Sequence, residues 1–148
     1  MRATSALLLA STVVAFPVQA QMPSSWDAVS RTLQAVPVPS AGYVRFNFPR
    51  RDLSVRIGDV AVTPALALTS WVGFAGDSTD AVMMGDIVTA GTELKDVLAE
   101  CARQGIGVTA VHNHLAGESP VVTYVHFHAS GSAESMATKL NADGTTPW

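Results

Sequence analysis

The feature that most constrains the fold is a pair of His-x-His patterns near the C-terminal end of the chain. The 148 residues contain four histidines, and all four belong to these patterns. They are His112, His114, His126 and His128. Both patterns lie in alternating runs rich in β-branched residues, which predict strands. Side chains two residues apart on a strand share a face, so each pattern directs both of its imidazoles to one side of a sheet.

The segment between the two runs predicts a turn, because Gly117 and Pro120 interrupt the strand pattern. If the runs pair as a hairpin centred near Pro120, the histidines face one another across it. Cross-strand neighbours have Cβ atoms about 4.5–5.5 Å apart, close enough for several imidazoles to bind one ion. The expected opposite pairs are His114 with His126 and His112 with His128.

Clustered imidazoles point to metal chemistry. Neutral imidazole is a good ligand for Zn, Cu, Fe and Ni, and three protein ligands plus an open position is the usual catalytic zinc arrangement. We therefore predict a divalent metal site, with zinc as the first choice, formed by His112, His114 and His126. His128 is expected to be a fourth ligand or a residue that supports the other three. Glu118, in the predicted turn, is expected to be a general base for water or a further oxygen ligand. The alternative is that each histidine is a half-buried sheet residue hydrogen-bonded to its neighbours.

The first twenty residues have the features of a secretory signal peptide. Arg2 gives a short basic region, residues 6–16 form an apolar run, and Val18-Gln19-Ala20 is a small-residue cleavage site. The apolar run is too short to span a bilayer, and no later stretch approaches about 20 apolar residues. We therefore expect a secreted or periplasmic protein, cleaved near Ala20, whose mature chain has no membrane span. An uncleaved anchor is the alternative.

The remaining 128 residues (148 minus 20) are enough for one domain with a hydrophobic core. We expect a helix and linker over 21–41, the domain over 42–141 and a tail over 142–148. Without Arg2, eight basic residues (nine minus one) face twelve acidic ones, which argues against a nucleic-acid partner and leaves a small-molecule ligand. Cys101 is the only cysteine, so no intrachain disulfide can form.

The order of the predicted elements indicates an α+β domain, with a largely antiparallel sheet covered by helices. Besides the histidine runs, strands are expected over 43–48, 53–57, 60–62, 66–74 and 81–88. Helices are expected over 26–35, 93–104 and 133–141. Ser24-Ser25 and Thr92 are expected to cap the first two helices, Ser132 to begin the third and Gly105 to end the second.

Other polar residues are candidates for supporting roles. Arg50 and Arg51 could bind a substrate carboxylate or phosphate, because guanidinium offers bidentate donors. The alternative is a solvated strand start with a local ion pair. Asp86 and Glu93 could hold an imidazole in the tautomer that a metal requires. The alternative is that Asp86 is a turn former and that Glu93 provides a negative charge that suits a helix N-terminus.

Several stretches, taken in order, resemble a known family. They are Arg51-Asp52-Leu53-Ser54-Val55, Ser70-Trp71-Val72-Gly73-Phe74, Met84-Gly85-Asp86-Ile87-Val88, the run Gly107 to Leu115 with its His-Asn-His-Leu, Glu118-Ser119-Pro120 and Tyr124-Val125-His126-Phe127. This series is similar to the LppY/LpqO family, a bacterial domain of unknown function named after mycobacterial lipoproteins. The resemblance covers about residues 42–140 and implies export without an established activity. The chain departs from the namesakes because it lacks a lipidated cysteine.

A second resemblance concerns the site alone. The spacing His112-x-His114, eleven residues, then His126 is similar to the zinc site of acetolactate decarboxylases, which combines three histidines with glutamates and an arginine. That likeness implies that these three histidines are ligands and that Arg50 or Arg51 binds a substrate carboxylate. A cupin is a weaker match, because the glycine expected six residues past Glu118 is absent and no second motif follows.

Overall fold

Strand β2 (Tyr43–Pro49) shows how the sequence builds the sheet in the computed structural model, which describes residues 24–141. Val44, Phe46 and Phe48 are buried, whereas Tyr43 and Arg45 alternate with them on the opposite face. A strand with one apolar face must bury that face against another layer, so the alternation fixes which side of the sheet the helices cover.

All the strand pairings are antiparallel, as predicted. The larger sheet has the order β1-β2-β5-β6-β9-β7, and a smaller one has the order β4-β3-β8. The strands are β1 (Val38–Ser40), β2, β3 (Val55–Ile57), β4 (Val60–Val62), β5 (Thr69–Gly76), β6 (Ala81–Ala90), β7 (Gly107–His112), β8 (Glu118–Ser119) and β9 (Val122–Gly131). The helices are the short 3-10 helix η1 (Ser24–Trp26), α1 (Asp27–Leu33), α2 (Glu93–Gln104) and α3 (Ala133–Leu140).

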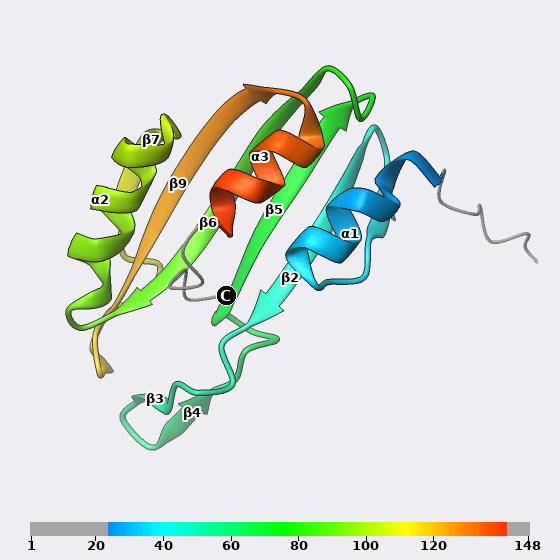
Figure 1. Cartoon of the computed structure of the whole chain (residues 1–148). Helices are drawn as coiled ribbons and strands as arrows, with labels where there is room; N and C mark the ends of the chain where they lie inside the picture. Colours follow the sequence, from blue (N-terminus) through cyan, green and yellow to red (C-terminus); the bar gives the residue numbers. More distant parts are fainter. Residues whose placement is uncertain (1–23, 142–148) are drawn as a thin grey trace, which may run out of the picture.

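The three α-helices lie on one side of the larger sheet (Figure 1). Their apolar side chains meet the inward residues of β2, β5, β6 and β9 in one core, which includes Trp26 and Val29 of the N-terminal segment, Cys101 of α2 and Met136 of α3. Burying this apolar surface is the main source of stability available to a domain without a disulfide. Among residues 24–141, no helix lies on the opposite side of the sheet, which we call the open face.

The smaller sheet covers one end of that open face. The β3–β4 hairpin projects beyond the ends of β2 and β5 (Figure 1). Val55 of β3 joins Leu68, Val88, Val122 and Tyr124 in a second apolar cluster, in which all five side chains are buried. The open face is therefore closed at the β3–β4 end and exposed along the rest of its length.

The fold class and most elements are confirmed, but several details of the prediction are wrong. The first helix runs over 27–33, because Gln34 adopts a left-handed conformation with φ 51° and stops it. β5 begins at Thr69 because the preceding backbone forms turns, with the Ala67 N–H donating to the Thr63 carbonyl at 3.2 Å. No side chain caps α1 or α2, and only Ser132, at the start of α3, accepts a capping hydrogen bond as expected.

Two further predictions concern the ends of the chain. The signal peptide and the C-terminal tail both lie outside the described residues. Within residues 24–141, no helix combines the length and the apolar character that crossing a membrane requires. Residues 24–41 contribute α1 and β1, and α1 packs against α3 and the core.

Candidate metal centre

Three histidines meet on the open face. His112 is the last residue of β7, His126 lies in β9, and His114 follows the end of β7. One ligand nitrogen of each lies within 4.8 Å of the other two. The rings of His112 and His126 are stacked, with centroids 4.8 Å apart and an angle of 5° between the planes. We call these three residues the histidine triad. All three remain partly exposed, so a small molecule can reach them.

The predicted register of the two histidine runs is wrong. β7 and β9 are antiparallel neighbours, but His112 lies opposite Tyr124 and His126 lies opposite Ala110. The connection between the two strands does not fold straight back, because it contains β8, which pairs with β3. His114 lies beyond the end of β7, so this connection, and not strand alternation, sets the position of its ring.

His128 is not part of the triad. It shares the open face with His126, but it is exposed and lies opposite Met84 on one side and Gly107 on the other. Its ring occupies the space above Gly107, where a Cβ would lie 2.5 Å from the imidazole Nε2. The structure therefore brings three of the four histidines together and places the fourth one step further along the sheet.

Asp86 is the carboxylate beside the triad. It lies in β6 directly opposite His126, and its side chain is only 5% exposed. One oxygen, Oδ2, is 3.7 Å from Nε2 of His114 and 3.8 Å from Nε2 of His126, and the other, Oδ1, is buried without a hydrogen-bond partner. Burial raises the pKa of this carboxyl, while the neighbouring imidazoles oppose that rise. Most buried polar atoms in folded proteins have a hydrogen-bond partner, so Oδ1 of Asp86 is an exception with unused hydrogen-bonding capacity.

Tyr124 positions His114, and the sequence analysis missed it. Its ring stacks on the His114 imidazole with centroids 3.7 Å apart, and its hydroxyl donates to the Ala67 carbonyl at 2.6 Å. Burial is the main reason that the pKa of Tyr124 lies above its usual value, and the charges of Asp86 and Glu118 add to it. Because Tyr124 precedes His126 by two residues on a strand, the shared face was the signal that could have identified it.

Glu118 is buried in β8, with 7% of its surface exposed, and pairs opposite Ile57 of β3. Its Oε1 has no hydrogen-bond partner. The charge of Glu118 helps to raise the pKa of Tyr124. The ring of Tyr124 is the one that stacks on His114. Glu118 therefore belongs to the smaller sheet, whereas Asp86 lies in the larger sheet directly beside the triad.

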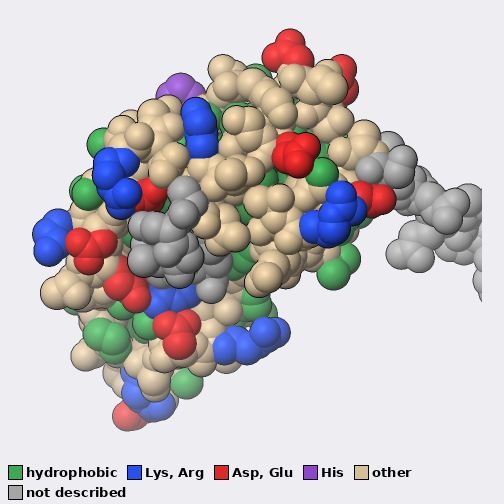
Figure 2. Space-filling view, viewed as in Figure 1, with side chains coloured by type: hydrophobic (Ala, Val, Ile, Leu, Met, Phe, Trp, Pro, Cys, Tyr) green, Lys and Arg blue, Asp and Glu red, His purple; other side chains and the backbone are tan. Residues whose placement is uncertain are grey.

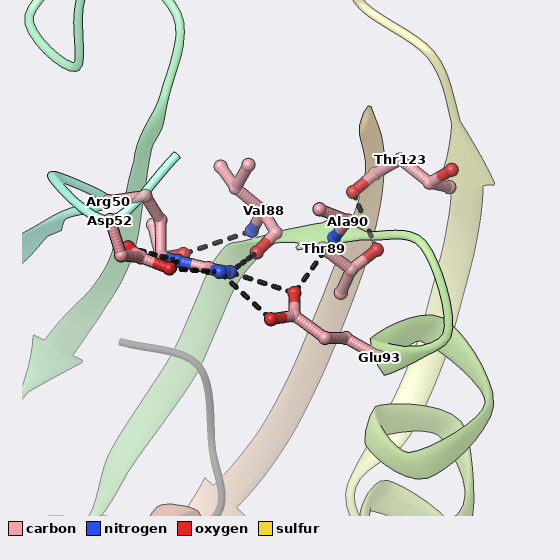
Figure 3. A network of polar contacts seen from close by, with 8 residues as sticks. Arg50, Asp52, Val88, Thr89, Ala90, Glu93 and Thr123 are labelled. Atoms are coloured by element: carbon pink, nitrogen blue, oxygen red, sulfur yellow. Dashed lines mark hydrogen bonds and ion pairs between the residues drawn. The ribbon is translucent and has the colours of Figure 1, made fainter. Parts of the chain in front are cut away.

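Arg50 and Glu93 form a separate, closed network (Figure 3). Every N–H of the Arg50 guanidinium has an acceptor: the Asp52 carboxylate, the Glu93 carboxylate and the Val88 carbonyl, at 2.7–3.0 Å. Glu93 also accepts from the Ala90 N–H at 2.8 Å. Burial lowers the pKa of Arg50, but its hydrogen bonds to the two carboxylates outweigh that effect and hold the pKa above its usual value. This geometry leaves Arg50 no free donor for a substrate.

The adjacent Arg51 has a different environment. It is exposed and lines a hollow of about 540 Å³ together with Arg45 and Asn47. Among the described residues, the helix-covered face has no such grouping of arginines. Basic and acidic side chains are interspersed on it, and histidine is visible only at one rim (Figure 2). Of the two arginines predicted to bind a substrate, the structure thus leaves Arg51 accessible and encloses Arg50.

The comparison with protein families gives one result that covers most of the chain. Residues 27–143 match the family model described as Domain of Unknown Function (DUF1259). Neither a curated protein nor a solved structure matches the chain. The matched region contains the histidine triad, Asp86 and Glu118. The chain belongs to the family described as Domain of Unknown Function (DUF1259).

Proposed function

We propose that this domain binds one divalent transition-metal ion, with zinc as the first choice, and that His112, His114 and His126 are its ligands. The observation that carries the proposal is the meeting of three ligand nitrogens within 4.8 Å beside a buried carboxylate. The resemblance to the LppY/LpqO family and the expected signal peptide support a role outside the cytoplasm. The histidine spacing shared with acetolactate decarboxylases supports the choice of ligands.

The distances around Asp86 are consistent with a metal site formed by the histidines alone. Hydrogen bonds between nitrogen and oxygen span about 2.7–3.2 Å, so separations of 3.7 and 3.8 Å are too long for direct bonds. Asp86 therefore lies beside the imidazoles without being bonded to them. This arrangement leaves the histidine nitrogens available to an ion and Asp86 available as a base next to it.

The first candidate activity is metal-assisted hydrolysis or decarboxylation of a small oxyanionic substrate. When bound, the ion would supply a Lewis acid that polarises a carbonyl or lowers the pKa of water. Asp86 is the first choice for a general base, because its Oδ2 lies beside Nε2 of His114 and Nε2 of His126. Glu118 is the second choice, because it is a buried carboxylate whose charge acts on Tyr124, the ring that stacks on His114.

The second candidate is a non-catalytic metal-binding or ligand-binding module of the cell envelope. The partial exposure of the triad favours the enzyme, since catalytic zinc keeps an open position whereas structural zinc is closed by four protein ligands. Spectroscopy of the cobalt-substituted protein separates the two. A coordination sphere that changes when azide is added indicates an exchangeable position, and an unchanged spectrum indicates the closed, non-catalytic site.

Elemental analysis of purified protein tests the metal site. Wild type should contain close to one equivalent of metal, and His114→Ala should contain much less, because two imidazoles alone bind zinc weakly. His128→Ala is the matched control and should keep the wild-type content, because that ring lies outside the triad. Equal metal content in His114→Ala and wild type would overturn the proposed site. Loss of metal in His128→Ala but not in His114→Ala would show that the metal binds at His128 and not at the triad.

A further inference from the structure

The open face carries a second polar feature at some distance from the triad. Arg45 of β2 and Arg51, just past the end of β2, line one hollow of about 540 Å³ with Asn47, Thr63 and Thr69. We call it the arginine hollow. Within residues 24–141, no carboxylate lies within 4.0 Å of either guanidinium, although the chain as a whole has a net charge of −3. Its size falls in the range of about 300–1,000 Å³ typical of small-molecule sites.

Arg45 is held in place from two sides. Its guanidinium carbon lies 4.2 Å above the ring of Trp71, and its Nε donates to Oδ1 of Asn47 at 2.7 Å. Stacking on an aromatic face and a fixed Nε–H orient the guanidinium, so it loses little conformational freedom when it binds a ligand. An oriented arginine with no carboxylate partner is typical of a site that recognises an oxyanion.

The arginine hollow and the triad lie along one row of the open face. Asn47 pairs opposite Trp71, Trp71 opposite Asp86, and Asp86 opposite His126. Three strand spacings of about 4.8 Å place Asn47 roughly 14 Å from His126.

The surface beside this row is apolar. Trp71 and Met84 line a second hollow of about 260 Å³ with Tyr43, Gly73 and Val82. Met84 is half exposed, although it precedes Asp86 by only two residues. Gly73 helps to keep this space open, because a Cβ there would lie 3.1 Å from the Tyr43 ring. An apolar cavity of about 150 Å³ can already hold a benzene ring, so this hollow can receive the apolar body of a ligand.

We propose that the arginine hollow binds the carboxylate or phosphate of an elongated organic substrate, whose apolar body lies against Trp71 and Met84 and whose far end reaches the histidine triad. The role of the far end rests on the proposed metal site, whereas anion binding by Arg45 and Arg51 does not. The substrate is then an amphipathic organic anion about 10–14 Å long, and not a simple inorganic ion.

Two-dimensional NMR titration of the full chain tests anion binding. The probes are 3-phenylpropionate, phenyl phosphate and the neutral 3-phenyl-1-propanol. Either anion should shift the signals of residues 45–51 and 63–71, and the alcohol should bind more weakly. The anion that binds more tightly identifies the group, carboxylate or phosphate, for which the hollow is suited.

Arginine variants give the decisive comparison. Arg45→Met combined with Arg51→Met should weaken anion binding about tenfold or more, because charge-assisted hydrogen bonds are lost. The control for a single loss of positive charge is Arg31→Met, which removes one charge from an exposed position on α1. Arg51→Met alone should show a smaller loss, and it keeps the test valid if the double variant misfolds, because Arg51 is exposed. Equal affinity in the Arg51→Met variant and the control would overturn the proposal.

Measuring anion binding at known metal content distinguishes a failure of the arginine hollow from a failure of the metal site. Each titration is run on protein treated with a chelator and on zinc-loaded protein of known metal content. Anion binding that depends on Arg51 in the metal-free sample supports the hollow even if no variant binds zinc. Conversely, a loaded triad with no arginine-dependent anion binding overturns the hollow and leaves the metal site standing.

Discussion

Two polar clusters interrupt the apolar interior of this domain, and they differ in how completely they are satisfied. Around Arg50, every donor has an acceptor and both carboxylates are bound. Around Asp86, a buried carboxylate oxygen has no partner, and three imidazoles converge without hydrogen-bonding one another. A closed network stabilises a fold by itself, whereas an open one has unused binding capacity. The comparison therefore favours a structural role for Arg50, and it is consistent with the metal site proposed for the triad.

The largest expected effect is the loss of stability when the closed network is broken. Arg50→Met leaves Glu93 and the Val88 carbonyl without their shared donor, so we expect the free energy of unfolding to fall by about 3 kcal/mol. Arg51→Met, one residue away and exposed, should change it by less than about 0.5 kcal/mol. Urea unfolding followed by circular dichroism measures both. Similar losses of unfolding free energy in the two variants would show that Arg50 has no special structural role.

The open network should gain stability from a ligand. Zinc at about 100 times its dissociation constant should raise the free energy of unfolding of wild type by about 2.7 kcal/mol, because the ion binds only the folded state well. His114→Ala should show little of this gain. The measurement is the thermal midpoint with and without zinc, and magnesium serves as the control ion because it prefers oxygen ligands. A rise of the same size with magnesium would count against histidine coordination.

Asp86→Asn should affect stability and metal binding in opposite directions. Removing a buried charge without a full set of partners should leave the metal-free protein as stable as wild type or slightly more stable. Metal affinity should fall about 10- to 100-fold, which is usual when a residue that supports a metal site is changed. A competition titration with a chromogenic chelator gives the affinity. A destabilised variant with unchanged affinity would place Asp86 with Arg50 among the structural residues.

The smallest expected effect concerns Asp52, at the exposed edge of the closed network. The hydrogen bond from Arg50 lowers the pKa of Asp52 below its ordinary value of 3.8. A carboxyl whose pKa is lower in the folded state adds stability above its ordinary pKa and loses it as the pH falls through the folded value. Unfolding curves of wild type and Asp52→Asn should therefore converge below about pH 4. Parallel curves across that range would show that the ion pair contributes nothing.

Local patterns were enough to predict much of this fold. The strands predicted over 43–48, 53–57 and 60–62 and the helix predicted over 93–104 all follow from patterns among near neighbours in sequence, and the structure has an element in each place. The meeting of His112, His114 and His126 could also be foreseen, because two His-x-His patterns on adjacent strands leave few alternatives. The α+β class followed from the order of these elements.

What the sequence could not provide depended on long-range pairing. The connection between β7 and β9 contains β8, whose pairing with β3 joins segments about sixty residues apart and has no local signal. The neighbourhood of Asp86 and the enclosure of Arg50 depend in the same way on strands and a helix from different parts of the chain. The tandem Arg50-Arg51 gave no sign that one residue would be enclosed and the other exposed.

The pairing of Glu118–Ser119 with Arg56–Ile57 has a consequence for engineering. The connection that carries His114 is paired with the β3–β4 hairpin, which lies about sixty residues earlier in the sequence. The position of the His114 imidazole therefore depends on that hairpin staying in place. A shortened version lacking residues 53–63 would retain all four histidines in its sequence, yet it would release the support that holds one member of the triad. Transplanting the His-x-His strands alone into another scaffold would fail for the same reason.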